Sequence, residues 1–270
     1  MPGPLEGIKV LDFTRVLAGP FATRILADLG ADVLKVEPPE GDMTRNIGKK
    51  IAGISGYYTQ QNVGKRSVCI DLLTEEGQQL AHKLVAEADV VTENFRPGVM
   101  ASFNLGWEDL KAINPKLVML SISGFGQEGP EKDRASYAPI IHAEMGLLHR
   151  QQQVTGTDKP VDIALSVADT STGMHGLIGL LAALHHAQRT GQGQHVDIAM
   201  INALMFTDDY VHFAIDKVRI VNGGGQVFHA TGGPIMLAGD EKWYPRVPWN
   251  RTRRSGLALM QRRQPSPHIE

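Results

Sequence analysis

Short apolar runs alternate with amphipathic stretches along the first 125 residues of the chain. Five of these runs predict β-strands, at residues 8–13, 32–37, 67–72, 90–95 and 117–123. After the first run, residues 20–29 predict a helix that begins at Pro20 and ends before Gly30. Strands that alternate with helices form a mostly parallel sheet with helices on both faces. We therefore predict a Rossmann-like α/β fold.

The second half of the chain contains the longest predicted helix. It covers residues 169–190 and ends at Gly191, a residue that commonly stops helices. The other elements predicted in this half are an amphipathic stretch at 139–148, a polar loop at 150–160, a strand at 161–168, a strand at 195–199 and a helix at 203–220. In parallel sheets ligands bind beyond the carboxyl ends of the strands. The loops after residues 13, 37, 95 and 123 are therefore the first candidates for a site.

The regular pattern stops near residue 245. Six arginines follow, and no acidic residue occurs before Glu270. We divide the chain into a large domain at 1–221, a linker and the start of a smaller domain at 222–244, and a basic, disordered tail at 245–270. A tail that binds nucleic acid and a change of reading frame just after Trp243 are the other interpretations of the last segment.

The composition is that of a soluble globular protein, with 42% hydrophobic and 21% charged residues. The formal net charge of -2 argues against nucleic acid or a membrane surface as a partner. The single cysteine, Cys69, lies in an apolar run, so we expect it to be a buried strand residue in a reducing compartment. The sequence has neither a signal peptide nor a run long enough to span a membrane, and its Cys and His residues lack metal-ligand spacing. We therefore expect a cytoplasmic protein without a metal.

Asp169 stands where a predicted strand passes into the long helix. An aspartate at this position predicts an N-cap, but three observations favour a catalytic carboxylate. Strand-to-helix junctions are where α/β proteins bind ligands. Gly173, Gly176 and Gly179 recur every three residues at a cost of about 0.5–1 kcal/mol each, so a backbone or a ligand is expected to approach closely. The positive end of the helix would also stabilise the carboxylate and an oxyanion beside it.

The stretch Val167–His175 resembles the nucleophile segment of class III CoA transferases, the formyl-CoA and carnitine CoA-transferase group. The similarity covers residues 4–243 and includes, in the order of the family, blocks at 7–14, 18–22, 29–39, 41–45, 62–71, 93–98, 124–130 and 190–194. In that family an aspartate attacks an acyl-CoA thioester and carries CoA as an aspartyl-CoA thioester before a carboxylic acid accepts it. The resemblance therefore implies that Asp169 is this nucleophile.

The resemblance also implies the remaining site residues. Around the acyl-transfer site these are Arg15, Val16, Leu17, Tyr137, and a mobile glycine loop with Gly224 and Gly225; the alternative for the last two is an ordinary loop. Around the CoA moiety they are Asp42, Arg45, Lys65, Leu72, Asn94 and Arg96. Lys65 and Arg96 suit phosphate, although each can equally be a surface cation. Asp12 is interpreted as structural. The substrates implied are an acyl-CoA donor and a small carboxylic acid, with no further cofactor.

The sequence departs from close members of this group. Formyl-CoA transferases have a histidine in place of Arg15 and a glutamine in place of Leu17, so oxalate is not the expected acceptor, and Arg15 suggests another dicarboxylate. The related α-methylacyl-CoA racemases have a catalytic histidine where Tyr137 stands, which leaves that alternative without its base. Family members are longer and form interlocked homodimers. A homodimer is therefore expected, and a truncated, non-catalytic fragment is the second alternative.

Overall fold

The computed structural model describes residues 3–208 and four short strands that follow them. These strands are β9 (Val221–Asn222), β10 (Gln226–Val227), β11 (Ile235–Leu237) and β12 (Trp243–Pro245), which form two antiparallel pairs. The chain divides into one unit of Met1–His149 and Pro160–Asp208 and a second of Arg150–Lys159 and Asp209–Glu270. The predicted glycine loop, the tail and most of the helix predicted at 203–220 lie outside the described residues. The predicted domain boundary at residue 221 stays a prediction.

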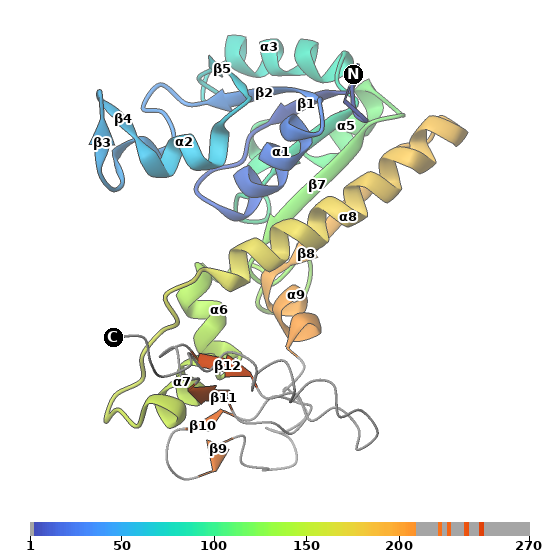
Figure 1. Ribbon diagram of the computed structural model, residues 1–270. Helices are drawn as coiled ribbons and strands as arrows, with labels where there is room; N and C mark the ends of the chain where they lie inside the picture. Colours follow the sequence, from blue (N-terminus) through green and yellow to red (C-terminus); the bar gives the residue numbers. More distant parts are fainter. Residues whose placement is uncertain (1–2, 209–220, 223–225, 228–234, 238–242, 246–270) are drawn as a thin grey trace, which may run out of the picture. The chain divides into compact units, whose positions relative to one another are not determined.

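A parallel sheet of six strands lies at the centre of the first unit (Figure 1). Its strands are β1 (Lys9–Asp12), β2 (Asp32–Glu37), β5 (Arg66–Cys69), β6 (Val90–Glu93), β7 (Val118–Ser123) and β8 (His195–Ala199). They follow the order β5-β2-β1-β6-β7-β8, and all neighbours are parallel. Because the chain moves outward in both directions from β1 and β6, the crevice beyond the carboxyl ends of these two strands is a natural ligand site. The predicted α/β fold is confirmed.

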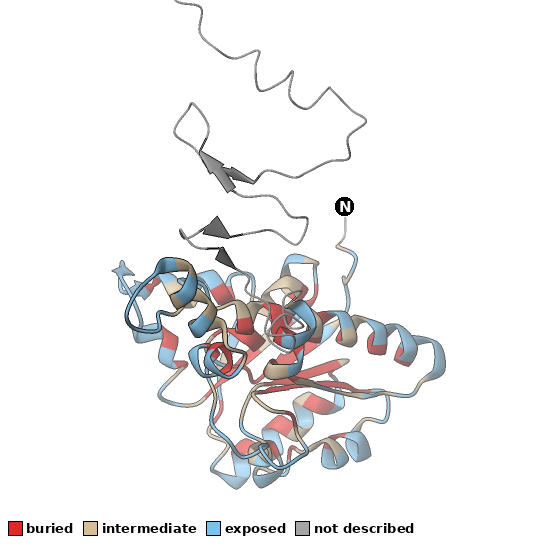
Figure 2. Cartoon of the chain, turned by 90° about the horizontal axis from the view of Figure 1, so that it is seen from below, coloured by how far each residue is buried: buried red, intermediate tan, exposed pale blue. Residues whose placement is uncertain are grey.

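Helices cover both faces of this sheet and enclose two hydrophobic cores. Neighbouring residues of β1, Val10 and Leu11, belong to different cores because successive strand residues point to opposite faces. One core is closed by α1 (Ala18–Asp28), α6 (Ala138–Glu144), α8 (Val167–Thr190) and α9 (Met200–Thr207); the other is closed by α3 (Glu75–Ala86), α4 (Val99–Ser102) and α5 (Trp107–Ile113). Figure 2 shows the buried positions along the strands and on the inner sides of the helices. None of the described helices is both long and apolar enough to cross a membrane.

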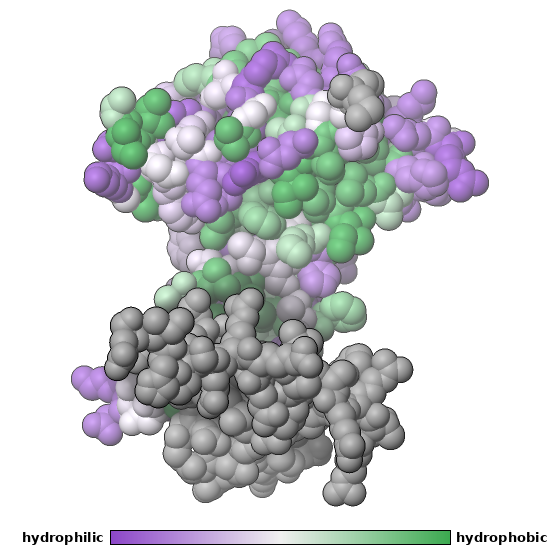
Figure 3. All heavy atoms as spheres, viewed as in Figure 1, coloured by the Kyte–Doolittle hydropathy of each residue, from purple (hydrophilic) through white to green (hydrophobic). Residues whose placement is uncertain are grey.

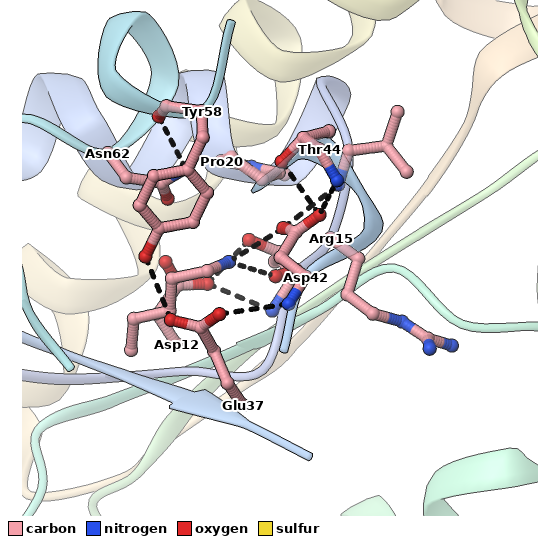
Figure 4. A network of polar contacts seen from close by, with 12 residues as sticks. Asp12, Arg15, Pro20, Glu37, Asp42, Thr44, Tyr58 and Asn62 are labelled. Atoms are coloured by element: carbon pink, nitrogen blue, oxygen red, sulfur yellow. Dashed lines mark hydrogen bonds and ion pairs between the residues drawn. The ribbon is translucent and has the colours of Figure 1, made fainter. Parts of the chain in front are cut away.

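A smaller excursion between β2 and β5 carries the remaining elements that matter for the site. It consists of a 3-10 helix, η1 (Met43–Asn46), a hairpin of β3 (Lys50–Ile51) and β4 (Ile54–Ser55), and α2 (Gly56–Asn62). The Asp42 side chain caps η1 by accepting a hydrogen bond from Thr44 N, and the Ser55 side chain caps α2 in the same way. This excursion brings Asp42 and Tyr58 back over the carboxyl ends of β1 and β2 (Figure 4).

Three predicted features are wrong, each for a reason of context. Residues 161–168 form no strand, because β8 already occupies the place beside β7; Val161 and Leu165 are 42% and 63% exposed. The loop predicted at 150–160 is helical as far as Thr155, the end of α7 (Leu147–Thr155). Cys69 is exposed rather than buried, because β5 is the edge strand of the sheet.

Candidate active site

A cavity of about 330 Å³ opens beyond the carboxyl ends of β1, β6 and β7. Its walls come from the segments that follow these strands, at 15–18, 94–97 and 122–124, and from α8 and the loop before α6. It brings together seven residues that the sequence analysis predicted for the site: Arg15, Val16, Leu17, Asn94, Arg96, Tyr137 and Asp169. The cavity therefore lies at the switch point where an open α/β sheet is expected to bind a ligand.

Asp169 lies in the first turn of α8, which begins at Val167 with Ser166 as its N-cap. The prediction that Asp169 itself is the N-cap is therefore wrong. Burial raises the pKa of the Asp169 carboxyl to about 6, and the backbone amide of Ala18 opposes this rise. The carboxylate is thus ionised at neutral pH but poorly solvated, the condition in which an anion is most reactive as a nucleophile.

The three glycines of α8 let this helix lie directly against its neighbours. A Cβ atom on Gly173 would stand 2.6 Å from the carbonyl oxygen of Ala18, and one on Gly179 would stand 2.9 Å from Cγ1 of Val196. At Gly176 the nearest neighbour would be the Leu120 side chain, at 3.2 Å. The expected close approach is confirmed, and at Gly173 it is the backbone at the start of α1 that approaches. Asp169, one turn earlier on the same helix, is held beside that start.

The segment between β1 and α1 has an unusual backbone. Val16 has a φ of 68°, in the left-handed region that a β-branched residue rarely adopts. The turn makes Leu17 the N-cap residue of α1 and Ala18 its first helical residue. The guanidinium of the preceding residue, Arg15, lies 4.6 Å from the ring centroid of Phe95. Within residues 3–208, no carboxylate lies within ion-pair distance of that guanidinium.

A buried network of charges lies beneath this segment (Figure 4). Asp12 Oδ2 is 3.0 Å from Lys65 Nζ, and Asp42 Oδ2 is 3.1 Å from Lys35 Nζ, with all four side chains at most 1% exposed. Burial alone would raise the pKa of Asp12, but Lys65, Lys35 and two hydroxyl donors together hold it well below its ordinary value. These contacts agree with the interpretation of Asp12 as a structural residue, which stays a prediction.

Several residues predicted to contact CoA are not among those that line the cavity. The Lys65 ammonium is enclosed by Asp12, Asn62 Oδ1 at 2.9 Å and Pro20 O at 3.1 Å. Asp42 is fully buried. Leu72 packs against the second core. The roles of these three in CoA binding stay predictions, although their side chains are already occupied within the protein.

Arg45, the fourth of these predicted CoA contacts, lies in an exposed part of the same network. Its guanidinium makes two hydrogen bonds to the Glu37 carboxylate, at 2.7 and 2.6 Å, and lies 3.9 Å from the ring centroid of Tyr58. Figure 4 shows a different orientation for Arg15, whose guanidinium points away from the network. Of the two arginines, only Arg15 lines the cavity.

Three polar residues near the cavity were not predicted from the sequence. Lys132 and Arg134 line it, and they come from the loop between β7 and α6. Burial raises the pKa of Tyr57, and the charge of Asp169 raises it further, so this phenol lies near the carboxylate. The basic residues follow a Gly/Pro-rich loop after a strand, a signal that could have found them. Within the described part of the chain, no cluster of three or more His, Cys, Asp or Glu residues suits a metal ion.

Comparison with known proteins agrees with this arrangement. The model of CoA-transferase family III matches residues 5–231. The chain belongs to this family. It is 44% identical over 207 residues to a succinate–glutarate CoA-transferase of Agrobacterium fabrum, an alignment that covers 74% of this chain and 51% of the relative. It is 42% identical over 207 residues to a formyl-CoA:oxalate CoA-transferase of Escherichia coli, with 76% and 49% covered.

A solved structure has a similar fold. The crystal structure of a CAIB/BAIF family protein from Brucella suis matches with a TM-score of 0.75 and 38% sequence identity, over 89% of this chain and 65% of that one. This chain spans about half the length of the curated relatives that it matches. The activity, substrates and assembly of a whole family member are therefore matters for proposal.

Proposed function

We propose that this chain provides the catalytic centre of an enzyme that moves CoA between carboxylic acids, with Asp169 as the covalent nucleophile. The observation that carries the proposal is the setting of Asp169: a desolvated carboxylate, with a pKa of about 6, in a cavity lined by arginine and lysine side chains. Membership of CoA-transferase family III supplies the reaction class. A carboxylate in such surroundings suits attack on a thioester, because it is ionised at neutral pH yet lacks a full hydration shell.

The proposed exchange proceeds through acyl transfers that balance without any further reagent. An oxygen of Asp169 attacks the donor thioester carbon and the C–S bond breaks. CoA departs as the thiolate, and Asp169 and the donor acyl group are joined in a mixed anhydride. The thiolate attacks the aspartyl carbonyl, which releases the donor acid and leaves CoA on Asp169 as a thioester. An acceptor carboxylate attacks that thioester to form a second anhydride and free the thiolate. Attack of the thiolate on the acceptor's acyl carbon then gives the new acyl-CoA and restores the Asp169 carboxylate.

Each tetrahedral intermediate in this sequence carries a negative oxygen that needs donors. The start of α1 supports that role, because the amide of Ala18 already acts on Asp169 and the amino-terminal end of a helix favours negative charge. Asp169 itself lies in the first turn of α8, a second helix end of the same polarity. The Asp169 carboxylate thus lies at the amino-terminal ends of two helices, α1 and α8.

The acceptor is proposed to be a dicarboxylic acid other than oxalate. Arg15 lines the same cavity as Asp169 and has its guanidinium over Phe95 rather than in an ion pair within residues 3–208. One carboxylate of the acceptor would react at Asp169 while the other pairs with Arg15. The names of two relatives, a succinate–glutarate and a succinyl-CoA–D-citramalate CoA-transferase, agree with acids of this length. Turnover of succinate and glutarate above that of oxalate and of monocarboxylates is expected; a preference for a monocarboxylate would exclude this role of Arg15.

The CoA moiety is proposed to bind at the wall of the cavity that carries basic side chains. Arg96 and Lys132 line that wall and suit the phosphates of CoA. The predicted contacts of Gly224 and Gly225, the assembly into a homodimer and a cytoplasmic location accompany this proposal as predictions from the family resemblance.

The nucleophile is tested by mass spectrometry of the 270-residue chain. Incubation with succinyl-CoA in the absence of an acceptor should add the mass of CoA, less that of a water molecule, to the peptide that contains Asp169, and hydroxylamine should release the CoA. Asp169→Ala should lose the adduct and lower turnover by roughly 10³-fold or more. Full activity in Asp169→Ala would refute the mechanism. Exchange of the α-proton in heavy water without CoA transfer would instead support the racemase, and a folded chain without either activity would support the non-catalytic fragment.

A further inference from the structure

Side chains from several elements hold the backbone of the segment that leads from β1 into the cavity. Lys35 Nζ donates to Thr14 O at 2.6 Å, and Asp12 Oδ1 accepts from Thr14 N at 2.9 Å. The side-chain amide of Asn94 makes two hydrogen bonds to Arg15, one to the backbone N–H at 2.7 Å and one to the carbonyl at 2.8 Å. The next N–H, that of Val16, donates to Asp42 Oδ2 at 3.3 Å. Successive peptide groups are thus fixed by side chains rather than by a regular element.

Asp42 uses its two carboxylate oxygens for different neighbours. Oδ1 accepts from the backbone and the hydroxyl of Thr44, at 2.9 and 2.8 Å, within the excursion after β2. Oδ2 accepts from Val16 and lies 3.1 Å from Lys35 Nζ. The side chain is completely buried, so its oxygens serve these partners rather than a ligand. Asp42 therefore joins the excursion after β2 to the strained turn after β1.

The strain at Val16 explains why such a connection is needed. A β-branched residue at a φ of 68° is held against its own conformational preference, and it would return to a negative φ if its neighbours released it. That rotation would move the amides of Leu17 and Ala18, which follow directly and begin α1. Leu17 and Ala18 both line the cavity, and the Ala18 amide donates a hydrogen bond to the Asp169 carboxylate. The direction of the proposed oxyanion donors therefore depends on the conformation of Val16.

We propose that Asp42, paired with Lys35, is a positioning residue for the reaction: it holds Val16 in the left-handed conformation and thereby aims the amides at the start of α1 toward Asp169. This inference rests on the proposed function for its kinetic consequence only. It assigns to Asp42 a role that acts through the backbone and not through contact with CoA. The placement of reacting groups within a fraction of an ångström is worth large factors in rate, which is why a buried ion pair beneath a loop can matter to catalysis.

The substitution Asp42→Asn separates the two roles of the carboxylate. The amide oxygen of asparagine can keep both hydrogen bonds from Thr44, whereas its NH₂ group would face two donors, Val16 N–H and Lys35 Nζ. We expect kcat, and the rate of CoA addition to Asp169, to fall roughly 10- to 100-fold, while KM for the acyl-CoA changes less than about twofold.

Thr44→Val is the matched control. It removes a 2.8 Å hydrogen bond to the same carboxylate, at Oδ1, and leaves Oδ2 with Val16 and Lys35. Both variants should lower the midpoint of urea unfolding, but only Asp42→Asn should lower kcat. An equal loss of kcat in the two variants would mean that the network acts through stability alone and would overturn the proposal.

A second comparison asks whether Asp42 acts through Val16. Glycine adopts a positive φ without strain, so Val16→Gly removes the need for the holding contact. The loss of kcat caused by Asp42→Asn should therefore be several-fold smaller in a Val16→Gly background than in the natural one. The double variant also keeps the comparison possible if Asp42→Asn alone folds poorly. An equal loss in both backgrounds would refute the link between the two residues.

Hydrogen exchange gives a result that does not depend on turnover. Followed by NMR, the Val16 amide should exchange faster in Asp42→Asn than in the natural chain or in Thr44→Val, because its acceptor has become a donor. If the natural chain forms no CoA adduct but the amide behaves in this way, the proposed function fails and the positioning geometry stands. If the adduct forms and Val16 stays protected in Asp42→Asn, the positioning proposal fails and the proposed function stands.

Discussion

At the scale of single residues, the burial of the Asp169 carboxyl has a cost in stability. Burial raises the pKa of this carboxyl from 3.8 to about 6, so the folded chain holds its proton more tightly than the unfolded chain does. Between these two values the folded state binds more protons, and its stability therefore falls as the pH rises. Above about pH 6 the folded state carries a desolvated charge that favours unfolding. Catalytic carboxylates commonly have such a penalty, because the same desolvation makes them reactive.

Asp169→Asn should reveal this cost. The amide has no charge at any pH, so at pH 8 the variant should have a free energy of unfolding in urea that is about 1–3 kcal/mol higher than that of the natural chain. This difference should vanish toward pH 4. Its CoA transfer should be lost, and that of the natural chain should rise with pH through about 6. The matched control is Asp133→Asn, which changes an exposed aspartate. Equal stability of Asp169→Asn and the natural chain at pH 8 would contradict the burial argument.

At the scale of elements, strands and loops differ in how far the sequence predicts them. The strands at 32–37 and 195–199 have their predicted bounds, because alternation and apolar runs are local signals. The strand predicted at 161–168 is wrong, because the local pattern cannot show that the place beside β7 is already filled by β8. The place of Arg15 at the cavity followed from the rule on strand ends, because Arg15 comes after β1. Asp169 follows no strand, so only the family resemblance placed it there. The inward direction of Asp42 could not be predicted, because it depends on the path of an irregular excursion.

The start of α8 illustrates an interaction that no local pattern indicates. Ser166, its N-cap residue, makes no side-chain cap, and the backbone N–H of Ala168 instead donates to Nε2 of His142 on α6 at 3.2 Å. Nδ1 of this fully buried imidazole lies 2.8 Å from Asp162 Oδ1, so the acid fixes the tautomer. The helix that carries the proposed nucleophile is thus capped by a side chain from another helix.

His142→Leu should therefore destabilise the chain by about 1–3 kcal/mol, because it leaves the Ala168 amide without an acceptor in a buried place. His142→Gln keeps an acceptor oxygen and should recover at least half of that loss. The measurement is the free energy of unfolding in urea for the two variants. A glutamine variant no more stable than the leucine variant would show that packing, rather than the hydrogen bond, is what His142 contributes.

A second element-scale prediction concerns Glu93 at the end of β6, which faces Ser121 of β7. Burial raises the pKa of Glu93 from 4.5 to about 7; the charge of Asp197 on β8 adds to the rise, and the Ser121 hydroxyl opposes it. Because the folded chain holds the extra proton, stability falls as the pH rises from 4.5 to about 7. Glu93→Gln should be more stable than the natural chain by up to about 3 kcal/mol at pH 8 and little different at pH 4. Glu40→Gln, at an exposed position, should show no such dependence; a flat difference for Glu93→Gln would refute the prediction.

At the scale of the whole molecule, the face of α8 that turns away from the sheet is apolar. Met174 and Ile178 are 50% and 67% exposed, and Figure 3 shows apolar side chains gathered over α8 and α1. Surfaces of this kind usually meet a partner surface. The family resemblance predicts a homodimer. A two-fold interface would use the same face of both copies, so one substitution would change the interface at two places.

We therefore expect the chain to associate through α8, and Ile178→Lys to weaken that association. Each isoleucine withdrawn from water contributes roughly 1.5–3 kcal/mol, so the dissociation constant should rise by about tenfold or more for each copy of the residue. Light scattering over a range of concentrations should show the mass of two chains for the natural sequence and one for the variant. Leu80→Lys is the control, since Leu80 is 44% exposed on α3, across the sheet from α8. A charge on α3 should leave the mass unchanged; equal effects of the two lysines would mean that association does not use α8.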